Sequence, residues 1–128
     1  MKLQRLRSDT EGATAVEFAV MAPLFLVLTF GVIEVGLLMW IVLGLQHGVE
    51  MAARCATINT TLCNTTSDIQ NFGAQNAYGL NPAPAAFTVN TLAACGNQVT
   101  ANYTFNWLTD YFFAAPSLTL SARSCYPK

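Results

Sequence analysis

The longest hydrophobic stretch of the chain runs from Phe18 to Leu45, and Glu34 is the only ionisable residue among its 28 positions. At 1.5 Å per residue, a helix of that length measures about 42 Å. The hydrocarbon core of a bilayer needs only about 30 Å. We therefore expect one helix over residues 13–58 that crosses a membrane and continues beyond it as a stalk.

A second, short helix is predicted at residues 67–80. Ser67 precedes Gln70 by three positions, which is the spacing of a helix cap. Gly79 followed by Asn81-Pro82 is typical of a helix end. Apolar side chains recur between these signals, so the helix is expected to be amphipathic.

Three strands are predicted next. Residues 99–107 alternate between apolar and polar positions without a break, the pattern of a strand with one buried face. Shorter strands are expected at residues 86–93 and 118–123. The expected fold class is α+β: a long N-terminal transmembrane and stalk helix, a short second helix and a small three-stranded antiparallel sheet with one face covered by helix. The buried face of the central strand would carry Val99, Ala101, Tyr103, Phe105 and Trp107.

Composition narrows the class of protein. Of the 128 residues, 53% are hydrophobic and 10% are charged, against about 25% charged residues in soluble domains. This composition is the opposite of the disordered signature and does not fit an ordinary cytosolic globule. Six Lys and Arg with a net charge of −1 leave little to neutralise phosphates, so nucleic acid is excluded as a partner.

The distribution of charge predicts the orientation of the helix. Lys2, Arg5 and Arg7 precede the hydrophobic stretch, and cations on a short flank indicate the cytoplasmic side. A cleaved secretory signal is the competing interpretation. The length of the stretch argues against it, no convincing A-x-A cleavage site follows it, and acidic residues lie close to its start.

All four cysteines follow the hydrophobic stretch, which favours structural disulfides in an exported domain. Four cysteines allow three pairings, and the sequence alone does not choose among them. Proximity suggests Cys55 with Cys63, which would leave Cys95 with Cys125. Each bond would stabilise a small domain by about 2–4 kcal/mol.

Catalysis is not indicated. Outside the long helix region the carboxylates are few and widely spaced, there is no Ser, His and acid set, and His47 is the only histidine. We expect no catalytic, cofactor-binding or metal-ligating residues, and an interaction role instead.

The junction before the hydrophobic stretch carries a specific motif, Gly12-Ala13-Thr14-Ala15-Val16-Glu17-Phe18. A glycine, four residues, then Glu and an aromatic resembles the processing site of type IV pilin precursors. The stretch from Gly12 to Trp40, with Ala22-Pro23 and Phe30-Gly31-Val32-Ile33-Glu34-Val35-Gly36, is similar to the TadE-like family of tight-adherence (Flp-type) pilus assembly pseudopilins. Residues 118–122, Leu-Thr-Leu-Ser-Ala, resemble the last strand of that family.

The resemblance implies a minor pilin that a prepilin peptidase cuts between Gly12 and Ala13. It implies a leader at residues 1–12, the helix at 13–58 and a periplasmic domain at 59–128, anchored in the bacterial inner membrane. Its partners would be other pilins through the helix, the inner-membrane assembly platform and the lipid bilayer. The alternatives are an uncleaved single-pass membrane protein with a binding domain outside, and a major fibre subunit.

Five further residues are candidate contacts. Glu17, followed by Phe18, is costly in an apolar helix, and the α-amine that cleavage creates would lie one helical turn away. We expect Glu17 to select axial register in an assembly. The competing interpretation is an interfacial carboxylate favoured by the helix dipole. Glu34 is either a partner contact or a solvated interfacial residue. Tyr111 and Phe113, in an aromatic loop, are either subunit contacts or packed under the sheet.

Overall fold

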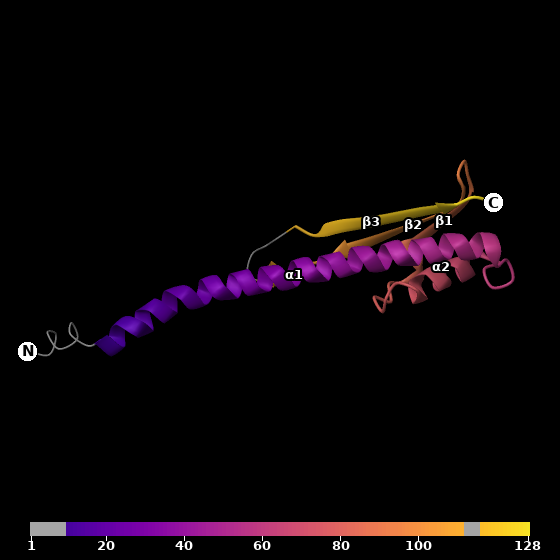
Figure 1. The fold of residues 1–128 in the computed structure, drawn as a ribbon. Coiled ribbons are helices and arrows are strands. Elements are labelled where there is room, and N and C mark those ends of the chain that lie inside the picture. Colours follow the sequence, from indigo (N-terminus) through magenta and orange to yellow (C-terminus); the bar gives the residue numbers. More distant parts are fainter. Residues whose placement is uncertain (1–9, 112–115) are drawn as a thin grey trace, which may run out of the picture. The chain divides into compact units, whose positions relative to one another are not determined.

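The computed structural model describes residues 10–111 and 116–128, and it confirms the α+β class (Figure 1). The chain divides into two compact units, residues 1–36 and residues 37–128. The second unit therefore includes the later part of the long helix together with the sheet. The elements are α1 (Thr10–Ile58), α2 (Thr66–Gln75), the 3₁₀ turn η2 (Pro84–Ala86), β1 (Phe87–Ala93), β2 (Gly96–Phe105), the 3₁₀ turn η3 (Leu108–Tyr111) and β3 (Leu118–Tyr126).

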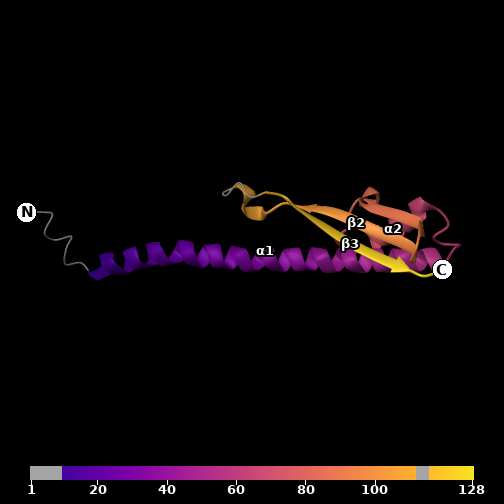
Figure 2. The same ribbon diagram turned by 90° about the horizontal axis from the view of Figure 1, so that it is seen from above.

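The sheet is an antiparallel meander in the order β1-β2-β3 (Figure 2). Phe87 pairs with Ala101, and Phe105 pairs with Leu118. β2 begins at Gly96, three residues earlier than predicted, because Gly96 adopts a φ of +115° that closes the hairpin from β1. β3 continues to Tyr126, three residues beyond the prediction.

One face of the sheet packs against the later part of α1, as the alternation predicted. Val99 and Ala101 of β2 are fully buried, and so are Leu45 and Val49 of α1. The side chains that alternate with them on β2 are more exposed. The core is completed by Ile41, Ala52, Ala53, Cys55, Cys63, Ile69, Ala74, Phe87, Phe105 and Ala122.

The predicted start and end of the second helix were wrong. Thr65, not Ser67, caps α2: its hydroxyl accepts from the Asp68 N–H at 3.2 Å, and the Asp68 carboxylate accepts from the Thr65 N–H at 3.0 Å. This reciprocal pair satisfies two helix-end donors at once. The helix ends at Gln75, and Asn76 is its C-cap. It cannot continue to Leu80 because Tyr78 and Gly79 have φ values of +47° and +74°.

Three glycines allow α2 and the segment after it to approach α1 and β1 closely. A Cβ on Gly48 would lie 2.8 Å from the Gly73 carbonyl oxygen, and one on Gly44 would lie 2.9 Å from the Ala77 carbonyl oxygen. A Cβ on Gly73 would lie 2.9 Å from the Phe87 ring. The pair at positions 44 and 48 therefore serves packing within the chain.

Both disulfides form as proximity suggested. Cys55–Cys63 ties the end of α1 to the loop before α2, and Cys95–Cys125 ties the β1–β2 hairpin to the end of β3. The two bonds thus brace the end of the second unit that lies farthest from Leu37 along α1.

The glycine packing predicts the effect of a methyl group. Gly48→Ala should lower the free energy of unfolding by about 1–3 kcal/mol, because the new Cβ meets backbone rather than a flexible side chain. Urea unfolding in detergent micelles, followed by tryptophan fluorescence, measures this. Gly31→Ala is the control, because nothing lies within 4 Å of a Cβ there. Equal stability of the two variants would contradict the close approach.

The two disulfides should contribute unequally. Their sequence separations are 30 for Cys95–Cys125 and 8 for Cys55–Cys63. Loop-closure entropy then gives about 3.5 and about 2.5 kcal/mol. Paired Cys→Ala variants compared by urea unfolding should show the larger loss for the first bond. The reverse order would mean that native packing, not chain entropy, sets the contribution.

Candidate functional site

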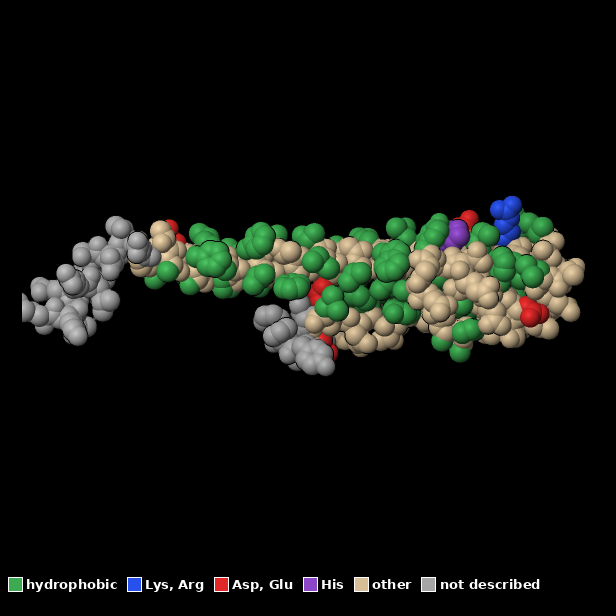
Figure 3. Space-filling view, turned by 90° about the horizontal axis from the view of Figure 1, so that it is seen from below, with side chains coloured by type: hydrophobic (Ala, Val, Ile, Leu, Met, Phe, Trp, Pro, Cys, Tyr) green, Lys and Arg blue, Asp and Glu red, His purple; other side chains and the backbone are tan. Residues whose placement is uncertain are grey.

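The first half of α1 presents apolar side chains to its surroundings, and Figure 3 shows them along the helix. Phe18 is 74% exposed, and Phe25 is 70% exposed. Within the described part of the chain, this is the one helix long and apolar enough to cross a membrane. A surface of this kind is stable against lipid or against other apolar helices, but not against water.

The predicted processing site lies in the first turn of α1. Gly12 and Ala13 are both helical and exposed. A Cβ on Gly12 would have nothing within 4 Å, so the glycine is not required there for packing. The first turn of a helix lacks acceptors for its N–H groups and unwinds most easily. A protease that binds extended chain could therefore reach this bond at low cost.

The Glu17 side chain is exposed on α1, four residues after Ala13. Side chains at this spacing are neighbours on a helix surface. Phe18 projects beside it with most of its surface free. The two residues predicted to set register are thus available to a partner.

Glu34 differs, because only 6% of its surface is exposed. With Asn97 it makes up the buried polar residues of the described chain. Asn97 is satisfied locally, since its Nδ2 donates to the Ala56 carbonyl at 3.1 Å and to the Thr57 hydroxyl at 2.9 Å. A partner could reach Glu34 only after a rearrangement, so a partner contact at this position stays a prediction.

The aromatic loop after β2 is described only in part. Phe113 and the side chain of Tyr111 lie outside the described residues, so their predicted contacts stay predictions. Trp107, just before the loop, packs edge-on against Phe105 with ring centroids 5.2 Å apart. Its Nε1 donates to the Pro116 carbonyl at 3.0 Å.

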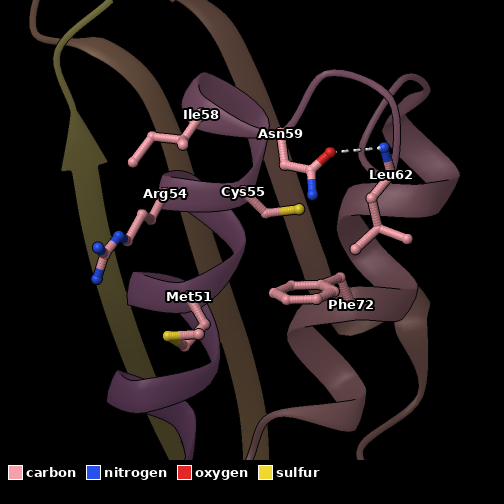
Figure 4. A pocket seen from close by; sticks show the side chains of 7 residues that line it. All are labelled: Met51, Arg54, Cys55, Ile58, Asn59, Leu62 and Phe72. Atoms are coloured by element: carbon pink, nitrogen blue, oxygen red, sulfur yellow. Dashed lines mark hydrogen bonds between the residues drawn. The ribbon is translucent and has the colours of Figure 1, made fainter.

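An open groove of about 180 Å³ lies between the end of α1 and α2 (Figure 4). Its lining is mostly apolar, with the exposed Arg54 at one side. This volume is below the range of enclosed small-molecule sites. The groove fits a contact surface better than a substrate pocket. The lining residues are Met51, Arg54, Cys55, Ile58, Asn59, Leu62 and Phe72.

One polar contact escaped the sequence analysis. The Nδ1 atom of His47 lies 2.7 Å from the Asn76 carbonyl oxygen. Because a carbonyl only accepts, Nδ1 carries a proton and donates. The imidazole also stacks on Tyr78 at 4.2 Å between ring centroids. These two contacts hold the turn after α2, where Tyr78 has its unusual positive φ. Separations of 29 and 31 positions along the sequence hid them.

Two observations on the described residues concern thiol and metal chemistry. All four cysteines are in disulfides. Across residues 10–111 and 116–128, no group of three or more His, Cys, Asp or Glu is placed to hold a metal ion. The surfaces that stand out are instead an exposed apolar helix and an apolar groove.

Comparison with known protein families gives a match that lies within α1. Residues 12–54 match the family model described as TadE-like protein. The match begins at the predicted processing glycine and covers the exposed part of α1. No curated protein and no solved structure gives a significant match to the chain.

Proposed function

Because the chain carries a TadE-like segment at residues 12–54, we propose that it is a minor pilin that takes part in assembling an adhesive pilus of the tight-adherence type. The family is one of structural pilus components, and the long apolar helix makes the protein membrane-anchored. The observation that supports the proposal most is the coincidence of that family match with an exposed apolar helix.

The proposed mechanism begins with removal of residues 1–12 by a prepilin peptidase of the inner membrane. The N-terminus would lie in the cytoplasm and the second unit in the periplasm. Cleavage leaves α1 with a free amine on Ala13 and places it one turn from Glu17. It also removes the cationic flank that holds the precursor at the cytoplasmic face. The mature helix could then move out of the bilayer with its assembly.

Glu17 would then set the axial register of packed helices. An unpaired carboxylate in hydrocarbon costs about 2.5–3.5 kcal/mol. The amine of the same subunit offsets this cost at any axial position, whereas the amine of a neighbouring subunit offsets it at only one. The pair thereby selects register, although paired charges in an apolar setting add little net stability. Glu34, Tyr111 and Phe113 are secondary candidates for contacts with other pilins or with the assembly platform.

The alternative function is that of an uncleaved membrane protein whose outer domain binds a ligand or an envelope component. The groove lined by Met51, Leu62 and Phe72 is the feature that such a protein would use. The two proposed functions predict different N-termini for the protein. The mass of the protein from its native envelope decides between them, since a chain beginning at Ala13 supports the pilin and an intact Met1 supports the alternative.

Replacing the processing glycine should block maturation. Gly12→Val should slow cleavage by about a hundredfold, because a side chain at the scissile bond displaces the reacting groups. The fold should not change, since nothing lies near that position. Mass spectrometry measures the cleaved fraction, with Gly31→Val as the control. Normal cleavage of Gly12→Val would contradict the proposed site.

Removing the charge at position 17 should impair assembly but not maturation. Glu17→Gln should lower pilus output by about tenfold or more, since the partner amine loses the carboxylate that selects register. Glu50→Gln is the matched control, because Glu50 is an exposed carboxylate of the same helix within the second unit. Sheared fibres and the cleaved fraction are quantified together. Unchanged output from Glu17→Gln would rule out the register role.

A further inference from the structure

The second unit carries exposed apolar side chains at the end where α1 enters it. This end begins at Leu37 and Leu38, which pack on the core. We call it the base and define it by five side chains with exposed fractions between 39% and 62%. They are Met39, Trp40 and Leu43 of α1, Leu108 of η3 and Leu118 of β3.

Contacts between β2 and α1 establish the direction of the strand. Asn97, near the start of β2, bonds to the carbonyl of Ala56 near the end of α1. Farther along, Ala101 pairs with Phe87, and the Phe87 ring lies 3.4 Å from a Cβ built on Gly48. β2 therefore runs antiparallel to α1.

The same direction brings the strand ends to the base. Four strand residues, from Ala101 to Phe105, cover about 14 Å. Nine helix residues, from Gly48 back to Met39, cover the same length. Phe105 and its partner Leu118 thus reach the level of Met39. Leu108 follows three residues later, at the same end of the unit.

Charge is concentrated away from the base. Among the described residues of this unit, Asp110 of η3 is the one charged residue beside the base. The charged residues of α1 and β3 within the unit lie farther from the base. They are Glu50 and Arg54 of α1 and Arg123 of β3, which pairs with Thr100, five positions along β2 from Phe105. Asp68 caps the start of α2, and Lys128 lies beside Ala56 and Thr57.

The length of the exposed apolar surface on α1 sets the depth of the base. Exposed large hydrophobic residues run from Val16 to Leu43, and the next exposed residue is Gln46. The interval from Val16 to Leu43 corresponds to about 40 Å of helix. A hydrocarbon core of about 30 Å ends some 20 residues after Val16, close to Gly36. The base then falls in the headgroup layer.

We propose that the base rests in the outer headgroup layer of the membrane, with Trp40 as its anchor. Tryptophan prefers this layer because its ring is apolar and its N–H needs a polar partner. The exposed residues of α1 from Phe18 to Leu43 are all apolar, which favours lipid over a second copy as the cover of the base. The second unit would therefore sit directly on the bilayer instead of on a free stalk. This inference goes beyond the proposed function in pilus assembly.

Tryptophan fluorescence tests the depth, since Trp40 and Trp107 are the only tryptophans. The full chain carrying Trp107→Phe is reconstituted in vesicles of phosphatidylethanolamine and phosphatidylglycerol. Lipids brominated near the headgroup should lower Trp40 emission about twofold, more than lipids brominated near the chain ends. Aqueous iodide should quench weakly.

Three outcomes would overturn the proposal. Strong iodide quenching without lipid quenching would mean a free stalk. Stronger quenching by deep bromines would put Trp40 inside the hydrocarbon. Lipid quenching that appears only when the protein is diluted in lipid would mean that a second copy covers the base.

A substitution at the base provides an independent measurement. Leu43→Asn should raise iodide quenching of Trp40 about twofold, because a polar side chain lowers the affinity of the base for the headgroup layer. Leu43 is 62% exposed, so the fold should tolerate the change. Gln46→Asn is the matched control one turn away. Trp40→Phe, which leaves Trp107 on Phe105, reports whether the fold is intact. Equal quenching in the Leu43 and Gln46 variants would contradict the proposal.

Discussion

A single helix has to be stable in two different environments, and this constraint organises the chain. Up to Gly36, α1 exposes large apolar side chains on its surface, which suits lipid or helices of a similar kind. From Leu37 onward it has one face in a protein core, where Leu45 and Val49 are fully buried. The opposite face becomes polar only at Gln46. The change of environment is therefore gradual and occurs within an unbroken helix.

The core of the second unit is small, and its packing reflects this size. Glycines at positions 44, 48 and 73 bring backbone to within van der Waals distance of neighbouring elements. Close approach increases dispersion contacts where large side chains are few. Two disulfides then restrain the unfolded chain, at the ends of α1 and of the sheet. A unit with so small a core depends on α1 for one whole side, so the membrane helix is also part of the fold.

The sequence predicted those elements whose pattern directly reflects burial. Alternation at 99–107 identified the central strand, because Val99 and Ala101 had to face the core. The capping signal at Ser67 and Gln70 gave the wrong start for α2, because Thr65 and Asp68 compete better for the helix-end donors. The stack of His47 on Tyr78 was out of reach, since it joins two segments that are distant in sequence. The prediction of the processing site and of a role for Glu17 came from the sequence motif and not from burial or packing.

The two residues of α1 on which the proposals depend, Glu17 for register and Trp40 for the base, constrain each other. Glu17 and Trp40 are 23 positions apart on α1, or about 34 Å along a helix. This length exceeds a hydrocarbon core of about 30 Å by only a few ångströms. A helix that has Trp40 in the outer headgroup layer would therefore have Glu17 near the opposite end of the hydrocarbon, where its carboxylate needs the amine of Ala13 as a partner. Movement of the subunit along the membrane normal would have to displace both residues together, which favours an external source of work over thermal motion of the helix.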